Sequence, residues 1–346
     1  MKNSRVLLSH GAGGVEMEEL LQSLIFNRVK EELKRVKDGV GIDFPDDGAT
    51  IPLGNGRYLV VTMDAYTVNP PLFPGGDIGK LAACGTINDL LMMGAKPIAM
   101  LDSIVVEEGF PMDQLNRIVD SFLKVLEDEN VAVIGGDFKV MPQKMLDKIV
   151  VTTVGLGFAS NPIVDNRIRE GDKIIVSGYL GDHGATILAL QQGIDVEGEG
   201  LKSDVSPLTR LVIPLVEKYG KFIHAARDPT RGGLAMLLND WAKSNDLIIV
   251  VDGAKVPVRE VVKSYAEMLG IDPLYLACEG AGVFAVDGNV AEEVLEYVKK
   301  LGYTNAEIIG EARRSERYSG LVLYRSEIGG LRILEPPTGE LVPRIC

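Results

Sequence analysis

The chain has 346 residues, of which 46% are hydrophobic and 25% are charged, a composition typical of a globular protein with two domains. Its 49 acidic residues outnumber its 36 basic residues, and the net charge of −13 argues against a surface for nucleic acid or anionic lipid. No apolar run approaches the roughly 18 residues of a membrane span, and residues 1–15 lack a signal-peptide core. We therefore expect neither nucleic-acid nor membrane partners, and a cytoplasmic location.

The first half alternates helical and extended patterns. Residues 15–36 have the spacing of an amphipathic helix, and residues 77–93 read as a strongly apolar, buried helix. A third helix is predicted at residues 112–126. The predicted strands are residues 58–63, 97–106, 131–134 and 148–158.

A second α/β pattern follows a loop at Asn161-Pro162, so we place the domain boundary near residue 160. The predicted strands of this half are residues 173–176, 247–251, 283–286 and 307–309, with two short strands within 319–334. The predicted helices are residues 183–192, 232–243, 258–269 and 290–301. The fold class is therefore α/β (α+β), with domains at 1–160 and 161–335.

The last eleven residues, 336–346, contain three prolines and end on a cysteine. Proline lacks the N–H that a helix or central strand requires, so we expect an extended, flexible tail. Such a tail can reach about 35 Å and could carry the Cys346 thiol to a site in its own subunit or in another. A disordered terminus is the alternative, and the tail alone does not exclude it.

Five acidic motifs stand at strand ends or in glycine-rich turns. Carboxylates beside flexible backbone suit a Mg²⁺–polyphosphate site, because the cation takes oxygen ligands and glycine N–H groups approach phosphate. Each alone could be an Asx-turn or a helix cap, and for Asp77 the cap is favoured. The motifs are Asp46-Asp47-Gly48, Met63-Asp64, Gly75-Gly76-Asp77, Asn88-Asp89 and Gly135-Gly136-Asp137.

Three further features could carry chemistry. Lys139 lies two positions after Asp137, so on an extended segment both would share one face and could meet a γ-phosphate. Asp228-Pro229-Thr230-Arg231-Gly232-Gly233 precedes a helix and could bind an anion there or simply cap it. Glu279, in a loop of small residues, could act as a base, although an isolated turn carboxylate is commoner.

Several simpler sites find little support. There is no Walker A motif, and the glycines of His10-Gly11-Ala12-Gly13-Gly14 follow no strong strand. Cys84, Cys278 and Cys346 are far apart with no CxxC, so neither a zinc site nor a disulfide framework is expected. The first two cysteines read as small buried side chains, and the scattered histidines as structural ones.

The motifs together resemble those of one known family. DDGAT, MDAYTV, FPGGDIG, TINDLLMMGAKP, GGDFKV, GDHG, DPTRGG, CEG and PPTGELVPRIC follow the order of the hydrogenase maturation family HypE, over about residues 6–346. The family belongs to the ATP-using superfamily of aminoimidazole ribonucleotide synthetase, selenophosphate synthetase and thiamin-monophosphate kinase. The terminal Pro343-Arg344-Ile345-Cys346 is its specific marker.

The resemblance implies a fold, an activity and partners. Two N-terminal domains would pair their sheets into a β-barrel in a homodimer, with ATP and Mg²⁺ near the interface. Cys346 would receive a carbamoyl group from the carbamoyltransferase HypF. ATP would activate the carboxamide oxygen, and loss of phosphate and a proton would leave a thiocyanate. The cyanide would pass to iron on the HypC–HypD scaffold of [NiFe]-hydrogenase maturation.

The same resemblance assigns residues. Cys346, Glu279 and Lys139 would be catalytic, with Glu279 as the base. Mg²⁺ would be held by Asp47, Asp64, Asp89 and Asp137. The expected ATP-binding residues are Asp46, Asp47, Asp64, Asp89, Gly135, Gly136, Asp137, Lys139, Asp228, Thr230 and Arg231.

The chain departs from the family pattern around two of these residues. In the family's Asn-Glu-Gly-Lys motif, Cys278 replaces the asparagine and Ala281 the lysine, which removes a cation beside Glu279. Phe138 replaces a threonine near Lys139. The open alternatives are a kinase or synthetase of the same superfamily acting on a free small molecule, for which Cys346 would be dispensable, and a non-catalytic carrier or scaffold.

Overall fold

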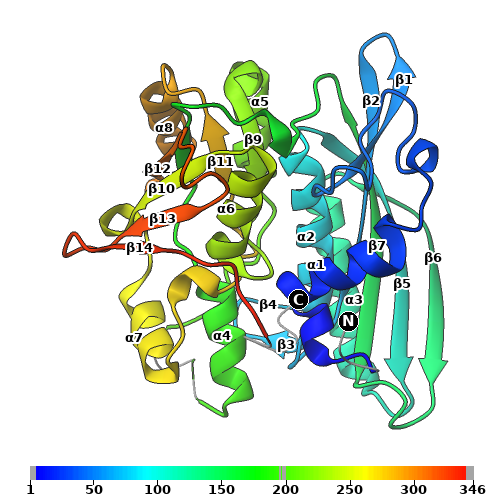
Figure 1. The fold of residues 1–346 in the computed structure, drawn as a ribbon. Helices are drawn as coiled ribbons and strands as arrows, with labels where there is room; N and C mark the ends of the chain where they lie inside the picture. The colour runs from blue at the N-terminus through cyan, green and yellow to red at the C-terminus, as the bar shows by residue number, and fades with distance from the viewer. Residues whose placement is uncertain (1–4, 195, 197–199, 340–346) are drawn as a thin grey trace.

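Two sheets face each other across a layer of helices (Figure 1). The computed structural model describes residues 5–194, 196 and 200–339. The first sheet ends with β7 at Ala159, and the second begins with β8 at Lys173, so the α/β halves are consecutive in the chain. Within the described residues, no helix is long and apolar enough to cross a bilayer.

The first sheet has the strand order β1-β2-β7-β5-β6. All neighbours are antiparallel except β5 and β6, which are parallel and joined through the helix α3. Helices α2 and α3 pack together, and α2 also contacts β2, β5 and β7. The bounds are β1 Ala49–Gly54, β2 Arg57–Tyr66, β5 Lys96–Glu107, β6 Ala132–Met141, β7 Ile149–Ala159, α2 Ile78–Met92 and α3 Met112–Asp128.

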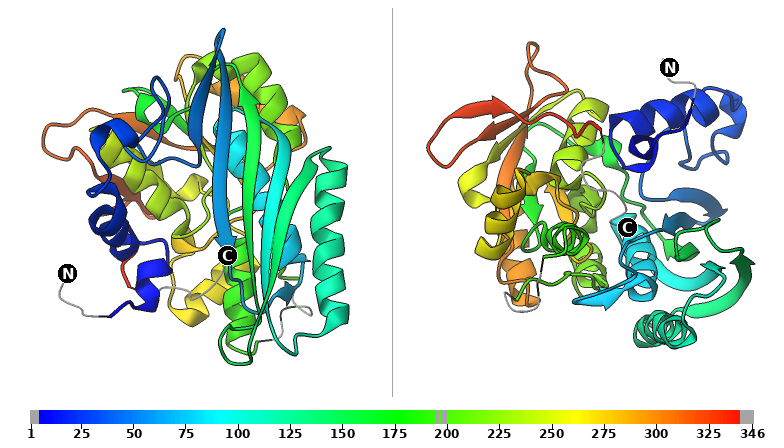
Figure 2. Two further views of the ribbon diagram at one scale, coloured as in Figure 1. Left: turned by 90° about the vertical axis from the view of Figure 1, so that its right-hand side faces the viewer. Right: turned by 90° about the horizontal axis from the view of Figure 1, so that it is seen from below.

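Helix α2 is the central element of the molecule. Thirteen of its fifteen residues are buried, because it lies between the first sheet, α3 and the helix α5 (Thr209–Tyr219) of the second half (Figure 2). Its first turn is capped by Asp77, whose carboxylate accepts the N–H groups of Gly79 and Lys80, which confirms the cap expected there. The helix therefore holds Asp89, near its end, at a fixed position between the two halves.

The second sheet has the strand order β14-β13-β10-β12-β8-β11-β9 and is mostly antiparallel, with β10 and β13 parallel. The bounds of its strands are β8 Lys173–Val176, β9 Ile223–Arg227, β10 Ile248–Asp252, β11 Val283–Val286, β12 Glu307–Arg313, β13 Val322–Arg325 and β14 Leu331–Ile333. The helices are α4 Asp182–Gln191, α5 Thr209–Tyr219, α6 Gly233–Ser244, α7 Glu260–Leu269 and α8 Ala291–Lys300. A small hairpin, β3 Leu72–Phe73 and β4 Gly76–Asp77, belongs to the first half.

The N-terminal segment differs from the single helix predicted at residues 15–36. The α-helix α1 covers only Val15–Leu21, followed by a π-helical turn Gln22–Phe26 and a short 3₁₀-helix Glu31–Leu33. None of these elements has a fully buried residue. Since helices this short depend on tertiary packing, the amphipathic pattern alone does not sustain a long one.

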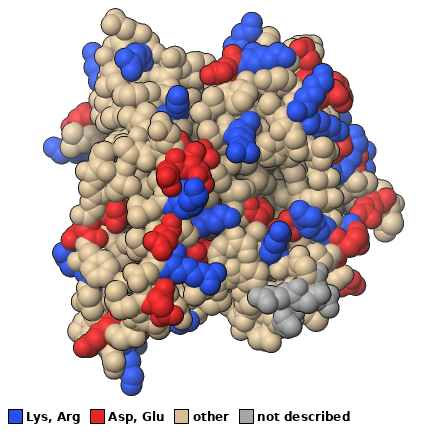
Figure 3. Space-filling view, turned by 180° about the vertical axis from the view of Figure 1, so that it is seen from behind, with Lys and Arg blue, Asp and Glu red and all other residues tan. Residues whose placement is uncertain are grey.

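Five of the described strands and α-helices have no counterpart in the sequence prediction. They are β1, β3, β4, α5 and β9, and the predicted strand at 131–134 extends to Met141 as β6. The remaining 3₁₀-helices are Leu8–Gly11, Asp165–Arg167, Gly220–Phe222, Gly253–Lys255 and Pro273–Tyr275. On the face seen in Figure 3, acidic and basic side chains of the described residues are interspersed, with uncharged areas between them.

Candidate active site

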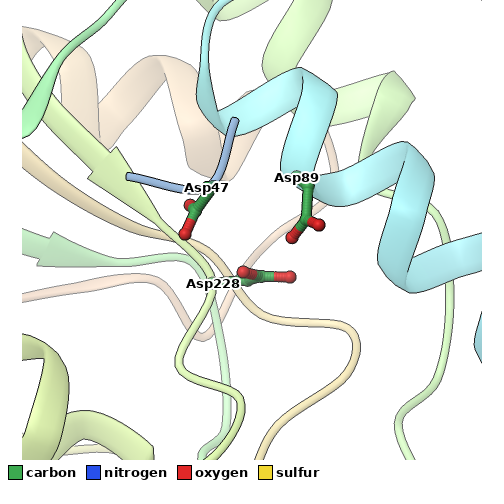
Figure 4. Close-up of side chains that lie close together, drawn as sticks. All are labelled: Asp47, Asp89 and Asp228. Atoms are coloured by element: carbon green, nitrogen blue, oxygen red, sulfur yellow. The ribbon is translucent and has the colours of Figure 1, made fainter. Parts of the chain in front are cut away.

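Three aspartates from distant parts of the chain converge between the two halves. Asp47 precedes β1, Asp89 lies on α2 and Asp228 directly follows β9. One carboxylate oxygen from each lies within 4.8 Å of the others, and the three side chains point toward a common centre (Figure 4). The chain thus brings together two of the four expected metal ligands, and adds Asp228, which had been expected only to bind nucleotide.

The donor set fits a hard divalent cation. The Oδ2 atoms of Asp47 and Asp228 are buried and make no hydrogen bond in the described structure, so each needs a cation or a proton. Asp89 is oriented by the hydroxyl of Thr62, which donates to its Oδ2 at 2.8 Å. Oxygen ligands of this kind suit Mg²⁺.

Burial and the convergence of carboxylates raise the pKa values of these groups. Burial, together with the charge of Asp64, raises the pKa of Asp228 from 3.8 to about 7. Burial also raises the pKa of Asp47 and Asp89 well above their ordinary values, and the other carboxylates of the group add to the shift. The three groups are therefore destabilised when all are charged, and a cation would relieve this repulsion.

Arg227 is the counter-charge to this group, and the sequence analysis missed it. Its guanidinium lies 3.3 Å from Asp47, 2.8 Å from Asp165 and 3.1 Å from Asp240. The residue ends β9, a strand that had not been predicted, and the only sequence signal was its position next to Asp228. Arg227 therefore ties the Asp46-Asp47 loop to the second half.

Asp46 supports the same loop through backbone contacts. Its carboxylate accepts the N–H of Asp47 at 2.9 Å and that of Asp165 at 3.0 Å. Burial, followed by the charge of Asp165, raises the pKa of Asp46 to about 7. Both carboxylate oxygens hold backbone groups, so Asp46 fixes the loop that presents Asp47.

Two hollows meet at these aspartates and share Asp46, Asp47, Thr230 and Arg231. The smaller, of about 180 Å³, is polar and is also lined by Asp64, Asp89 and Glu279, among others. The larger, of about 420 Å³, extends from Asp228 toward α1 and has apolar walls that include Met17, Phe26, Phe44, Met236 and Trp241.

The anion site predicted at residues 228–233 lies at this junction. Helix α6 begins at Gly233 without a side-chain cap, so the side chains of Asp228 and Thr230 are not used for capping. Arg231 lies 3.4 Å from Asp64, which places a cation at the wall of the smaller hollow, called the acidic cavity below. The segment therefore brings one acid, one hydroxyl and one guanidinium to the same site.

Glu279 lies at the end of this cavity and is only 1% exposed. Its Oε1 is buried and makes no hydrogen bond in the described structure. Burial raises its pKa well above the ordinary value, the charges of Asp228, Asp204 and Asp64 raise it further, and Arg231 lowers it. A buried carboxyl of raised pKa is a stronger base than an exposed glutamate once it is deprotonated.

The four expected site residues on β6 lie elsewhere in this chain. Gly135, Gly136, Asp137 and Lys139 belong to the exposed edge strand of the first sheet. Lys139 pairs with Asp137 at 2.8 Å, and of the described residues that line the two hollows none is on β6. The expectation that Asp137 and Lys139 share one face is confirmed, but Asp137 does not join the three-aspartate group.

The beginning of the tail is packed, although a flexible tail had been expected from residue 336. Pro337 is buried, and its carbonyl accepts the N–H of Val15 at 3.4 Å. Gly339 donates its N–H to Glu16 at 2.9 Å. Residues 336–339 thus lie at α1, beside the larger hollow, while Cys346 is outside the described residues.

The other cysteines and the buried histidines are structural, as predicted. Cys84 and Cys278 are buried, and burial raises the pKa of both thiols. His183 pairs with Ser203 at 2.8 Å, and His224 pairs with Asp172 at 2.7 Å. Neither pair lines the hollows described above.

Two family models match the chain. The AIR synthase related protein N-terminal domain matches residues 45–159, and the C-terminal domain of the same family matches residues 169–322. A Methanocaldococcus jannaschii protein named for hydrogenase expression and formation is 42% identical over 346 residues, covering 99% of this chain and all of the relative. The carbamoyl dehydratase HypE of Cupriavidus necator is 36% identical over 350 residues, covering 100% of this chain and 96% of the relative.

Solved structures agree with these matches. HypE in a HypE–HypF complex superposes with a TM-score of 0.83 at 36% identity, covering 92% of this chain and 99% of that one. HypE in complex with ATP gives a TM-score of 0.79 at 36% identity, covering 99% and 100%. A thiamine monophosphate kinase of Aquifex aeolicus, at 17% identity and a TM-score of 0.64, shares the fold. The chain therefore belongs to the HypE family of hydrogenase maturation proteins, within the AIR synthase related superfamily.

Proposed function

We propose that this chain is an ATP-dependent carbamoyl dehydratase of hydrogenase maturation, which converts a carbamoyl group on Cys346 to a thiocyanate. The observation that carries the proposal is the position of Glu279. Its buried Oε1, which no hydrogen bond from the described residues satisfies, lies in the same cavity as Asp47, Asp89 and Arg231, so a base and a polyphosphate site would adjoin. A dehydration that couples phosphoryl transfer to proton removal needs both.

Relatives support the reaction and the use of ATP. Several similar proteins are named carbamoyl dehydratase, and one HypE structure contains ATP. In this proposal residues 1–160 bind the nucleotide, residues 161–335 supply Glu279, and residues 336–346 carry the cysteine. HypF, seen in complex with HypE, would donate the carbamoyl group. A HypC–HypD complex would accept the cyanide.

Each step has a group suited to it. Asp47, Asp89 and Asp228 would hold Mg²⁺, which when bound neutralises phosphate charge and orients the transferred group. Thr230 and Arg231 would contact the phosphates from the start of α6. The carboxamide oxygen takes the γ-phosphoryl group of ATP, ADP leaves, and the nitrogen gives one proton to solvent. Phosphate then leaves with the C–O bond electrons, Glu279 removes the second proton, and the C≡N bond forms.

The start of the tail supports delivery of Cys346 to this cavity. Pro337 is fixed beside Gly14, which lines the larger hollow, and that hollow joins the acidic cavity. The seven residues after Gly339 can span about 25 Å when extended. In this proposal the larger hollow is the route by which the thiol would reach Glu279.

The first sheet supports a homodimer. Strand β2 and the edge strand β6 carry exposed apolar side chains, namely Met63, Ile134, Phe138 and Val140. Among the described residues, no strand pairs with the outer edge of β6, so its backbone groups are available there. Pairing of two such sheets into a barrel would bury these groups. It would also bring Asp137 and Lys139 to the interface, where they could complete an ATP site.

Replacing Glu279 with glutamine should separate the two chemical stages. The amide keeps the shape of the side chain but cannot accept a proton, so dehydration should slow by about a hundredfold or more. Carbamoylation of Cys346 by the donor system should continue. Intact-mass spectrometry with ATP follows both modifications. Glu267→Gln, on the exposed face of α7, is the matched control. Normal thiocyanate formation by Glu279→Gln would count against the assignment.

Magnesium should stabilise the chain more at about pH 8 than at about pH 6. The pKa of Asp228 is about 7 in the folded chain, against an ordinary value of 3.8. Between pH 3.8 and about pH 7, Asp228 holds a proton in the folded chain that it has lost in the unfolded chain. Protonation of this carboxyl therefore stabilises the fold at low pH, and this contribution to stability is lost as the pH rises through about 7. Mg²⁺ binds the deprotonated form and competes with that proton.

Thermal unfolding with and without Mg²⁺ at the two pH values measures this effect, with KCl at matched ionic strength as the control. The expected result is a larger Mg²⁺-induced rise in Tm at the higher pH. An equal or larger rise at the lower pH would contradict a carboxylate cation site.

A further inference from the structure

A segment that connects α4 and α5, residues 203–208, runs along the loop that carries Glu279. Asp204 on this segment accepts two consecutive backbone N–H groups from that loop. Its Oδ1 lies 3.1 Å from the nitrogen of Glu279, and its Oδ2 lies 3.1 Å from the nitrogen of Gly280. One carboxylate thus fixes the two peptide planes that flank the Cα atom of Glu279.

The carbonyl of Glu279 is held from the same side. It accepts the N–H of Ser206 at 3.2 Å and the side-chain amide of Asn88 at 3.4 Å. Asn88 also accepts the N–H of Leu208 at 2.8 Å and donates to the carbonyl of Ser206 at 3.1 Å. Because Asn88 precedes Asp89 on α2, the position of the base and that of a cation ligand depend on the same turn of helix.

Close packing leaves no freedom between the segment and the loop. A Cβ on Gly280 would lie 2.0 Å from the Asp204 carbonyl oxygen and 2.6 Å from the Ser206 hydroxyl, so only glycine fits. The segment is itself anchored on the first half, since Ser203 donates its N–H to Pro74 at 2.9 Å. The Ser203 hydroxyl pairs with the buried His183 at 2.8 Å. Asp204 is therefore presented by a rigid support.

The position of the Glu279 side chain depends on this backbone support. Its Oε1 has no hydrogen-bond partner in the described structure, so no bond to that oxygen orients the carboxylate. The family's lysine, which could have oriented it, is Ala281 here. Burial raises the pKa of Asp204 and the charge of Asp182 adds to the rise, while the bonds to the two N–H groups oppose it, which leaves this pKa at about 6. The group is thus mainly charged at neutral pH.

We propose that Asp204 is a positioning residue for Glu279, which holds the Glu279-Gly280 backbone so that the carboxylate faces the acidic cavity. The inference rests on the proposed role of Glu279 as the base. Asp204 lines neither of the two hollows at the three aspartates, and it acts only through the loop. Loss of its two hydrogen bonds displaces the base, and a misplacement of about 1 Å can slow a reaction by about a hundredfold.

The test compares Asp204→Ala and Asp204→Asn in the full-length chain. Carbamoylation of Cys346, ATP affinity and the rate of thiocyanate formation are measured separately. Asp204→Ala should slow only the last of these, by about a hundredfold. Asp204→Asn retains one acceptor oxygen and should fall between Asp204→Ala and the unchanged chain. The matched control is Asp287→Ala, which removes a half-buried aspartate, remote from the Glu279 loop in sequence, that likewise accepts a backbone N–H, from Asn289, at 2.9 Å.

A double-mutant cycle with Glu279→Gln identifies the route of the effect. If Asp204 acts through Glu279, adding Asp204→Ala to Glu279→Gln should cause little further loss. Additive losses, or normal dehydration by Asp204→Ala while Glu279→Gln is slow, would overturn the inference. Normal dehydration by Glu279→Gln would instead reject the proposed base. Should Asp204→Ala fail to fold, Asp204→Asn, which keeps the side-chain volume, carries the same cycle.

Discussion

Replacing Cys346 with alanine should abolish both carbamoylation and thiocyanate formation while leaving folding and nucleotide binding intact. The reacting carbon is joined to the protein through this sulfur, so no other group can compensate for its loss. The two remaining thiols are unsuited to the role, because Cys84 and Cys278 are buried and burial raises the pKa of both. The expected loss is therefore complete.

Selectivity for Cys346 should come from delivery rather than from unusual reactivity. An unperturbed cysteine thiol has a pKa of about 8.5 and is therefore mostly protonated at neutral pH. Arg344, two positions before it in the sequence, favours the thiolate only weakly when salt screens the two charges. The thiol should thus react well only when it is seated in the donor's site or in the cavity that contains Glu279.

Peptide mapping after incubation with ATP and the carbamoyl donor system measures where the chain is modified. Cys84→Ala, which removes a buried thiol from α2, is the control and should remain fully modified. Modification of Cys84 or Cys278 in the Cys346→Ala variant would show that the tail is not the carrier. Full hydrogenase maturation by that variant would favour a kinase or synthetase that acts on a free small molecule.

The sequence predicted the buried elements best. Helix α2 and strands β5 and β7 have long apolar patterns that match their burial between layers. The helix expected at residues 15–36 failed for the opposite reason, since that segment has no buried face to stabilise it. Strand β9 was missed because its sequence, Ile223–Arg227, includes a histidine and an arginine, yet folding buries His224 next to Asp172.

The candidate site was predicted in part for a related reason. Gly48 marks Asp47 in the sequence, and Asp89 is a charged residue within a strongly apolar helix, whereas the choice of ligands depends on which strands become neighbours. Asp228 joins the group only because β9 ends beside α2. Asp204 carries no such mark: it lies between Ser203 and Val205 in a segment without glycine, and its partners are backbone groups of residues 279 and 280.

The same geometry defines what the two halves contribute to one another. Asp89 comes from the first half, while Asp228, Arg231 and Glu279 come from the second, and Arg227 joins the two through Asp47. Since neither half has the complete site, any change in their relative position should alter cation binding and proton removal together. Asn88 and the segment 203–208 oppose such a change by joining α2 to the Glu279 loop.

Asp89→Asn should nearly eliminate ATP-dependent turnover while leaving the fold as stable as before or more so. The substitution removes one charge with little change in volume, and the Thr62 hydroxyl can still donate to the amide oxygen. Burial and the neighbouring carboxylates raise the pKa of Asp89 well above its ordinary value, so its charged form is disfavoured in the folded chain. Removing that charge relieves repulsion with Asp228 and Asp64, and this gain applies only when no cation is bound.

When Mg²⁺ is bound, Asp89→Asn should be unfavourable, because the substitution removes a ligand of the cation. A metal ion supplies several kcal/mol of charge stabilisation in phosphoryl transfer, so loss of a ligand should lower turnover by roughly a hundredfold or more. For Asp89→Asn, the Tm measured without Mg²⁺ should stay level or rise. The Mg²⁺-induced rise in Tm and the ATP turnover should both fall. Asp120→Asn, on the exposed side of α3, should change neither. Near-normal turnover by Asp89→Asn would reject the three-aspartate group as the cation site. A large fall in its Tm without Mg²⁺ would show that Asp89 stabilises the fold rather than serving the chemistry.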